Sequence, residues 1–407
     1  MVGIAILGYG VVGSGVYEVI RKNSDGITRR AGTKIDIKHI LDIREFNSHP
    51  EKELFTKNYD DILTDTDVSV VVEVMGGVNP AYEFTKRALE AKKSVVTSNK
   101  ELVAKHGCEL LKLASENKVH YLFEASVGGG IPIIRPLKLC LAANEISEIT
   151  GILNGTTNYI LTQMINKDET MENALKRAQD KGYAEKNPSA DIDGIDAVRK
   201  IAILTSLAFG KYVDSTKIPV TGIRNVTLTD VEYAKKSGCV IKLCGHCRAL
   251  ENGKLDVYVS PCFVPDESPL ASVDGVFNAI LVKGNAVGDA LFYGRGAGKL
   301  PTASAVVSDV IEIAKSGENT DSPVWEDVGG GILENSENSV SKHFARVKAD
   351  DKENVKAEIE KIFGGAQIID AEDGEIGFVT DEMTAKDFEN KLNELNKDII
   401  STFLVLS

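Results

Sequence analysis

The sequence predicts an α/β protein that begins with a doubly wound parallel sheet, continues into a second domain of α+β type, and ends in a small βαββαβ domain. Short apolar runs rich in β-branched residues alternate with helical periodicity over residues 1–131, and a glycine-rich turn follows the first run. After Pro132 the helices become longer and the strands alternate between apolar and polar residues. Strands that are apolar on both faces need helices on both faces, which is typical of parallel sheets.

The elements of the first domain follow one another as βαβ units. We expect strands at residues 2–7, 35–41, 68–74, 94–97 and 119–123. We expect helices between them at residues 11–21, 80–92 and 100–117. The N-terminal domain is therefore predicted to cover residues 1–131.

The second domain is predicted to cover residues 132–300. Its expected helices lie at 157–166, 170–181 and 195–209, and its expected strands at 144–153, 240–250, 255–264 and 278–287. A further helix, at 301–318 with Pro301 at its first position, is expected to return to the first domain. Residues 319–341 have the composition of a linker, and the βαββαβ order of residues 342–407 fits a ferredoxin-like sandwich.

Composition and charge exclude several classes of protein. The 407 residues include 47 Lys+Arg and 60 Asp+Glu, so the net charge of −13 disfavours nucleic acids and anionic membranes as partners. No apolar run approaches the ~20 residues that span a bilayer. The N-terminus has neither a basic segment nor a cleavage site typical of a signal peptide, and the six cysteines are scattered, so we expect a cytoplasmic protein.

The turn Gly8-Tyr9-Gly10-Val11-Val12-Gly13 follows the first strand and opens a helix. Gly8 permits the tight turn, Gly10 lets a pyrophosphate approach the backbone, and Gly13 lets the helix pack on the strand. The backbone of Val11 and Val12 lies at the helix N-terminus, which favours phosphate. In this context the motif predicts a Rossmann-type dinucleotide site.

Asp42 and Arg44, which follow the second strand, influence which dinucleotide binds. Asp42 favours a free ribose 2′-hydroxyl, whereas Arg44 favours a 2′-phosphate or is a solvated loop charge. Asp42 lies 29 residues past Gly13, more than the usual ~20, so we expect an extended connection. These two residues do not decide between NAD and NADP as the coenzyme.

Two lysines are candidates for the chemistry. Lys100 follows the short strand 94–97 at the edge where parallel sheets place ligands. Asp196 and Lys200 are four residues apart on one helix face, so they form either a surface salt bridge or a buried functional pair. The apolar residues around them favour burial, and a desolvated lysine can exchange a proton with the oxygen of a carbonyl under reduction.

Other polar segments are less informative alone. Glu185 and Asp191 precede the same helix, and with Asp196 they are candidates to hold a substrate ammonium group. The turns 151–158 and 294–298 open helices, and each is ordinary turn chemistry when taken alone. Cys244 and Cys247 form a C-x-x-C pair in a predicted strand, where they point to opposite faces, so we do not expect a zinc site.

Together these residues resemble homoserine dehydrogenase. The resemblance extends over about residues 1–315, and its most specific part is 191–200. Its segments are Gly8–Gly13, Ser98-Asn99-Lys100, 124–132, Asn154-Gly155-Thr156, Gly182-Tyr183-Ala184-Glu185, 191–200 and 294–303. The resemblance implies NAD(P)-dependent interconversion of L-homoserine and L-aspartate 4-semialdehyde, in the threonine and methionine branch of aspartate metabolism.

The resemblance also implies residue roles. Lys200 is the proton donor, and Lys100 is its companion at the substrate and the coenzyme. The substrate-binding residues are Glu185, Asp191, Asp196, Asn154 and Thr156. The backbones of Gly182 and Gly298 join the glycine-rich turn at the coenzyme, where Arg44 stays a candidate from its place after the second strand alone. A monovalent cation, sodium, is expected on the side chain of Glu124 and the carbonyls of Val127, Gly129 and Ile131.

The tail 342–407 resembles an ACT regulatory domain, which implies either feedback by threonine or stabilisation of a homodimer or homotetramer.

Two other functions compete with the interpretation of the protein as a homoserine dehydrogenase. A thioester-forming semialdehyde dehydrogenase needs a nucleophilic cysteine, but Cys108 and Cys140 lie in helical contexts without a nearby histidine. A non-catalytic ligand sensor would not need both lysines.

Overall fold

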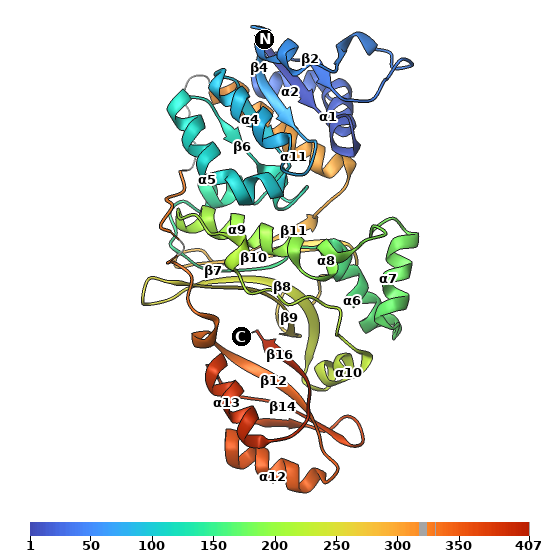
Figure 1. Ribbon diagram of the computed structural model, residues 1–407, viewed down its shortest axis with the longest axis vertical. Helices are drawn as coiled ribbons and strands as arrows, with labels where there is room; N and C mark the ends of the chain where they lie inside the picture. Colours follow the sequence, from blue (N-terminus) through green and yellow to red (C-terminus); the bar gives the residue numbers. More distant parts are fainter. Residues whose placement is uncertain (317–323, 330, 407) are drawn as a thin grey trace. The chain divides into compact units, whose positions relative to one another are not determined.

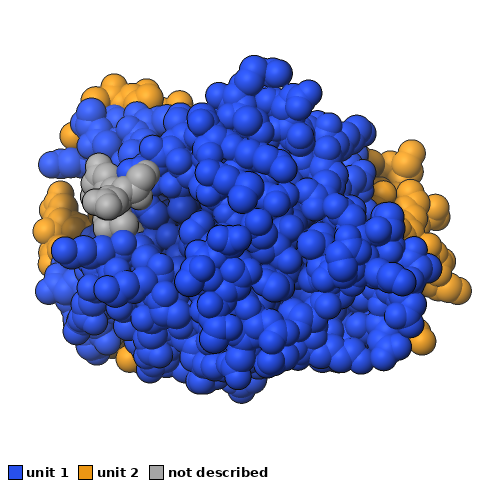
Figure 2. Space-filling view, turned by 90° about the horizontal axis from the view of Figure 1, so that it is seen from above, with its two compact units in different colours: residues 1–145, 202–216, 292–330 blue, residues 146–201, 217–291, 331–407 orange. Residues whose placement is uncertain are grey.

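The computed structural model describes residues 1–316, 324–329 and 331–406. The chain forms two compact units, coloured separately in Figure 2. Unit 1 comprises residues 1–145, 202–216 and 292–330, and unit 2 comprises residues 146–201, 217–291 and 331–407. Residues 317 and 318 of the predicted returning helix, and residues 319–323 and 330 of the predicted linker, lie outside the described residues.

A parallel sheet forms the centre of unit 1, as predicted, and it has six strands in the order β3-β2-β1-β4-β5-β6, one more than the five predicted because β3 was not expected. Figure 1 labels β2, β4 and β6 of this sheet and the helices around it. Its strands are β1 (Val2–Leu7), β2 (Ile35–Leu41), β3 (Phe55–Thr56), β4 (Val68–Glu73), β5 (Ser94–Thr97) and β6 (Tyr121–Leu122). The central strands are buried because helices cover both faces, which is why they read as continuous apolar runs. The carboxyl end of β1 leads into the glycine-rich turn, and the carboxyl end of β5 leads into the segment that carries Lys100.

The helices of unit 1 include the predicted ones and two short additions. They are α1 (Val11–Lys22), α2 (Ser24–Ala31), α3 (Tyr59–Thr64), α4 (Ala81–Glu90), α5 (Lys100–Asn117) and α11 (Lys299–Ser316). The additional α2 explains why Asp42 lies so far from Gly13, since the connection holds a second helix. Helix α11 begins two residues before Pro301, and a side chain at Gly15 would meet the Lys299 carbonyl, so α1 and α11 pack closely.

Unit 2 is built on a ten-stranded mixed sheet, in which nine strands follow the path β11-β10-β7-β8-β9-β16-β12-β14-β13 and the tenth, β15, pairs with β12 off this path. Its first strands are β7 (Ile146–Ile152), β8 (Cys239–Ala249), β9 (Leu255–Pro265), β10 (Phe277–Gly284) and β11 (Gly288–Arg295). The associated helices are α6 (Gly155–Lys167), α7 (Met171–Asp180), α8 (Ser189–Ile192), α9 (Ile195–Phe209) and α10 (Leu228–Lys236). Residues 202–209 of α9 and residues 292–295 of β11 belong to unit 1. The predicted strand 278–287 ends at Gly284, because residues 285–287 form the turn into β11, a strand that the sequence patterns did not indicate.

The tail has the predicted βαββαβ order. Its elements are β12 (Val340–Lys348), α12 (Lys352–Phe363), β13 (Gln367–Ile369), β14 (Glu375–Val379), β15 (Met383–Thr384), α13 (Ala385–Leu395) and β16 (Ile399–Val405). The strand order β16-β12-β14-β13 with antiparallel pairing is that of a ferredoxin-like sandwich. Since β12 begins at Val340, the last two residues of the predicted linker already belong to a strand.

The tail is anchored to the rest of unit 2 in two ways. Strand β16 pairs in parallel with β9, which makes the sheet continuous. Arg346 on β12 pairs with the fully buried carboxylate of Asp230 on α10 at 3.1 Å, and the same carboxylate accepts a hydrogen bond from Ser401. Buried ion pairs need such additional hydrogen bonds to offset desolvation.

A search of the described helices for a long apolar stretch that could cross a bilayer found no candidate.

Candidate functional site

The glycine-rich turn between β1 and α1 has the geometry that a pyrophosphate requires. Gly8 adopts φ +96°, a left-handed conformation that favours glycine. Gly13 packs so closely that an added Cβ would overlap the Gly8 carbonyl oxygen, whereas a Cβ on Gly10 would meet no protein atom within 4 Å. Gly10 is the N-cap of α1. The open space beside Gly10, at a helix N-terminus, therefore fits a phosphate group.

Asp42 and Arg44 form one cluster beside this turn. The Asp42 carboxylate accepts hydrogen bonds from the Tyr9 N–H at 2.8 Å and from the Arg44 guanidinium at 2.8 and 2.9 Å. The hydrogen bonds from Arg44 hold the pKa of Asp42 well below its usual value. The Asp42 side chain is 7% exposed and that of Arg44 is 57% exposed. The cation is thus the group that this cluster presents to solvent.

Lys100 begins α5, directly after β5, in unit 1. Its backbone position is fixed by Asn99, whose side chain caps the helix by accepting from the Leu102 N–H. Thr97 accepts from the Asn99 N–H and donates to the buried carboxylate of Glu73 at 2.7 Å. Burial raises the pKa of Glu73. Sequence reasoning missed Glu73, which ends a continuous apolar strand and so gave no periodic signal.

Lys200 is the central group of the site in unit 2. Its Nζ donates to Asp196 Oδ2 at 2.8 Å and to the backbone carbonyl of Leu153 at 2.7 Å. Lys200 is 6% exposed and Asp196 is 5% exposed, so the pair is buried. The surface alternative is therefore wrong for this pair. The Leu153 carbonyl was not predicted, because a backbone acceptor leaves no mark on residue type.

Asn154 joins the two aspartates that the sequence analysis selected. Its Nδ2 donates to Asp191 Oδ1 at 2.7 Å and to Asp196 Oδ2 at 2.9 Å. Its Oδ1 accepts from the Thr157 N–H and so caps α6. One side chain thus connects the end of β7 with α6 and with the segment that carries Lys200. The structure brings Asn154, Asp191, Asp196 and Lys200 together.

The remaining predicted residues of this unit lie in the neighbouring loop. Thr156 donates through its hydroxyl to the Tyr183 carbonyl at 2.7 Å, which holds the loop 182–185 against the start of α6. Gly182 has φ +72° and Glu185 is exposed. Glu185 is not part of the buried cluster.

The predicted cation segment is a tight turn in unit 1. Both carboxylate oxygens of Glu124 accept backbone N–H groups, Oε1 from Ile133 and Ile134 at 2.6 and 2.9 Å, and Oε2 from Arg135 at 2.7 Å. Val127, Gly129 and Ile131 are buried. Among the described residues no hydrogen-bond donor meets their backbone carbonyl oxygens. Three such carbonyls and a partly used carboxylate are a donor set that suits a weakly held hard cation.

The second glycine-rich turn lies against this segment. A Cβ on Gly129 would overlap the Gly296 carbonyl, and the Gly130 N–H donates to the Arg295 carbonyl at 3.0 Å. Gly298 follows with φ +130° and leads into α11. The positive φ of Gly298 and the close approach of Gly129 to Gly296 are therefore both positions that need glycine.

Replacing Asn154 by alanine is expected to destabilise unit 2 by about 1 kcal/mol through loss of the α6 cap alone. The stability of unit 2 falls further because Asp191 and Asp196 no longer share an amide donor. Urea unfolding of Asn154→Ala measures both effects together. Asn166→Ala is the matched control, since Asn166 lies at the exposed end of the same helix and bonds only Asp274. Equal losses for the two variants would contradict the bridging role of Asn154.

Comparisons with known proteins show the family of this chain. Residues 8–124 match the family model "Homoserine dehydrogenase, NAD binding domain" and residues 132–311 match the model "Homoserine dehydrogenase". A homoserine dehydrogenase of Bacillus subtilis is 37% identical over 99% of this chain and 98% of its own length. The chain belongs to the homoserine dehydrogenase family. As in that family, it is an NAD(P)-dependent oxidoreductase that acts on a CH–OH group and interconverts L-homoserine and L-aspartate 4-semialdehyde.

Solved structures of homoserine dehydrogenases support the same assignment over the whole fold. The enzyme from Thiobacillus denitrificans superposes with a TM-score of 0.90 at 35% identity, and the alignment covers 100% of this chain and 98% of that one. A hyperthermophilic archaeal homoserine dehydrogenase mutant, solved in complex with NADPH, superposes with a TM-score of 0.66 at 30% identity. That alignment covers 78% of this chain and 98% of the archaeal chain, so the family fold does not require the whole length.

Proposed function

We propose that Lys200 is the group that exchanges the proton in homoserine dehydrogenation. The observation that supports this role is the burial of its Nζ between Asp196 and the Leu153 carbonyl, which fixes the direction in which it can donate. When bound, the nicotinamide coenzyme supplies hydride chemistry at the substrate carbon. Lys200 gives a proton to the oxygen in the direction of aldehyde reduction, and it receives the hydroxyl proton in the direction of homoserine oxidation.

The acidic groups near Lys200 are proposed to orient the substrate. Asp191 is half-buried and is fixed by Asn154, so its carboxylate can hold the ammonium group of homoserine without moving. Glu185 and Thr156 contribute from the loop 182–185 and the start of α6. Lys100 is proposed as the companion of Lys200 at the substrate and the coenzyme.

The backbones of Gly8, Gly10, Val11, Val12 and Gly13, together with Gly182 and Gly298, are proposed to contact the coenzyme. Arg44 is proposed to determine whether NADP or NAD binds as the coenzyme. Because Asp42 is occupied by Tyr9 and Arg44, it is poorly placed to accept from a ribose 2′-hydroxyl, whereas the exposed guanidinium can bind a 2′-phosphate. This arrangement supports preference for NADP over NAD.

Arg44→Ala is expected to raise the KM for NADP⁺ by about 10- to 100-fold, the value of one charge-assisted contact, and to change the KM for NAD⁺ much less. Steady-state oxidation of homoserine with each coenzyme measures the difference. Arg30→Ala, on the exposed end of α2 in the same unit, is the control. A similar rise of both KM values in Arg44→Ala would show that Arg44 does not read the 2′-phosphate.

A sodium ion is proposed at Glu124 and the carbonyls of Val127, Gly129 and Ile131. Support comes from the three buried carbonyls that no donor meets among the described residues. No step of the reaction is assigned to the ion. It would hold the turn in the conformation that packs against Gly296.

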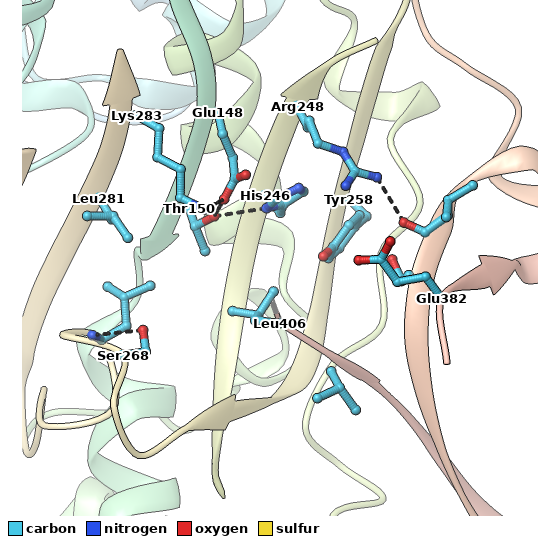
Figure 3. A pocket seen from close by; sticks show the side chains of 14 residues that line it. Glu148, Thr150, His246, Arg248, Tyr258, Ser268, Leu281, Lys283, Glu382 and Leu406 are labelled. Atoms are coloured by element: carbon cyan, nitrogen blue, oxygen red, sulfur yellow. Dashed lines mark hydrogen bonds and ion pairs between the residues drawn. The ribbon is translucent and has the colours of Figure 1, made fainter. Parts of the chain in front are cut away.

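Threonine is proposed as an effector that acts through the tail. Figure 3 shows a pocket of unit 2 where the sheet meets the ends of tail strands β12 and β16. Cationic side chains of Arg248 and Lys283 and the anionic side chain of Glu382 line it, so it offers partners to both charges of an amino acid. The buried Nε of Arg248 has no acceptor among the described residues, which supports an anionic ligand.

Adding threonine to the homoserine oxidation assay is expected to inhibit the wild-type enzyme, and Arg248→Met is expected to need more threonine for the same inhibition. Reaction rates at increasing threonine, with each coenzyme, measure this shift. The control is Lys397→Met, because Lys397 lies elsewhere in the tail. Absence of inhibition in the wild type would leave the tail with a purely structural role.

A homodimer or homotetramer is the proposed assembly. Strand β11 lies at the end of the sheet path and exposes Leu291 and Tyr293, which favours burial against another copy. Light scattering coupled to size-exclusion chromatography would measure the mass.

The proposed roles of the lysines are tested by steady-state kinetics of the wild-type enzyme and its Lys100 and Lys200 variants with L-homoserine. Loss of turnover in the Lys200 variant with retained coenzyme binding supports the assignment. Equal turnover of that variant and the wild type would refute it.

A further inference from the structure

We propose that Asp309 and Arg135 are positioning residues that hold the turn 124–131 in its cation-binding shape. This inference rests on the sodium site proposed above. Neither residue was singled out by the sequence motifs, and nothing in the family comparison assigns them a role. Both lie in unit 1, as do Glu124 and the turn.

Hydrogen bonds connect Glu124, Arg135 and Asp309 in a closed ring. Asp309 Oδ2 accepts from the Glu124 N–H at 2.9 Å, and Asp309 Oδ1 accepts from Arg135 Nη2 at 2.7 Å. The ring closes because the Arg135 N–H donates to Glu124 Oε2 at 2.7 Å. Both ends of the turn, residues 124 and 133–135, are thereby fixed to each other and to Asp309.

The ring is anchored to a long helix far along the chain. Asp309 lies in the middle of α11. Arg135 also bonds two other residues of this helix, Ser308 through Nη1 at 2.8 Å and Glu312 through Nε. Since α11 packs on α1 at Gly15 and begins directly after Gly298, the ring ties the turn to the helices beside the coenzyme motifs.

Burial and charge make the ring suited to a cation rather than to packing alone. Glu124 is 3% exposed and Asp309 is 2% exposed, and the Arg135 guanidinium bonds Asp309, whereas the Arg135 backbone N–H bonds Glu124. Glu124 begins the turn whose Val127, Gly129 and Ile131 carbonyls meet no hydrogen-bond donor among the described residues. Carboxylate and carbonyl oxygens of this kind attract a hard cation, and the residues that bond such ligands hold them in place, as in other metal sites.

The chain contains a natural reporter for this turn. Trp325 is the only tryptophan, and its ring lies edge-on against Phe123 with centroids 5.7 Å apart. Phe123 immediately precedes Glu124. A change in the turn upon sodium binding should therefore alter the fluorescence of Trp325 without any need to measure activity.

The test is a sodium chloride titration of the coenzyme-free protein, with choline chloride keeping the ionic strength constant. Tryptophan fluorescence and the melting temperature are recorded for the wild type, Asp309→Asn and Glu312→Gln. The wild type should saturate, and Asp309→Asn should bind sodium about tenfold or more weakly. Glu312→Gln should stay within about twofold, because the Glu312 side chain is 31% exposed and its ion pair with Arg135 Nε lies outside the closed ring of hydrogen bonds.

If Asp309→Asn does not fold, Arg135→Lys replaces it, since lysine keeps the charge but cannot bond Asp309 and Ser308 together. Sodium affinity of the folded variant equal to that of the wild type overturns the inference, and so does a wild type that shows no sodium response. Homoserine oxidation by the wild type is measured separately. Turnover without a sodium response refutes the inference alone, and a sodium response that depends on Asp309 without turnover refutes the proposed function alone.

Discussion

Lys200→Ala is expected to lower kcat for homoserine oxidation by about 100- to 10,000-fold, the range that a positioned general acid or base contributes. The physical reason is that Nζ of Lys200 is buried and held by Asp196 and the Leu153 carbonyl, so water cannot take its place in the same geometry. Steady-state kinetics at saturating homoserine and coenzyme measures the loss. The KM for the coenzyme should change little.

Two controls separate proton transfer from loss of charge or stability. Lys200→Arg keeps a cation beside Asp196, but a guanidinium does not release its proton at accessible pH, so this variant should remain slow. Removal of the lysine also leaves the buried Asp196 without its cation, so the melting temperature must be recorded for each variant. Wild-type turnover in folded Lys200→Ala would refute the role of this residue.

Gly10→Val is expected to weaken coenzyme binding by about 100-fold or more while the protein still folds. An added Cβ at this position meets no protein atom within 4 Å, and the side chain would fill the space proposed for a pyrophosphate at the N-terminus of α1. The cost to folding should stay near 1 kcal/mol, because valine is a poorer N-cap than glycine. Fluorescence titration with NADPH measures affinity, and thermal unfolding measures stability.

Gly13→Val is the matched comparison within the same turn. Here the added side chain overlaps the Gly8 carbonyl, so the fold itself should be damaged, with a large fall in melting temperature. The two variants thus distinguish a glycine that the ligand needs from one that packing needs. Tight NADPH binding by Gly10→Val would contradict the assignment of the open space to the pyrophosphate.

The fold was largely predictable because its strong patterns are local. Buried parallel strands are continuous apolar runs, and the tail shows clear alternation between strand and helix, so both were found from the sequence. Strand β11 was missed since its residues alternate between exposed and half-buried positions, which hides an edge strand. Helix α2 was missed because it follows α1 after one residue, and only the long spacing to Asp42 hinted at it.

The part of the site that side chains form was predictable from the sequence. The i, i+4 spacing of Asp196 and Lys200 predicted a common face, and the apolar surroundings predicted burial. The Leu153 carbonyl and the Asp309–Arg135 ring were not predictable, because a backbone acceptor has no residue signature and Asp309 is separated from Glu124 by 185 residues. Long-range pairing of this kind requires the folded chain.

The most direct test of the central claim is the structure of the enzyme with NADP⁺ and L-homoserine bound. The Nζ of Lys200 should lie about 2.6–3.2 Å from the substrate hydroxyl oxygen, within hydrogen-bond reach, with Lys100 at the same substrate. The nicotinamide ring should then face the carbon that bears this hydroxyl. A substrate hydroxyl that lies outside the reach of Lys200, directly or through one water, would contradict the account.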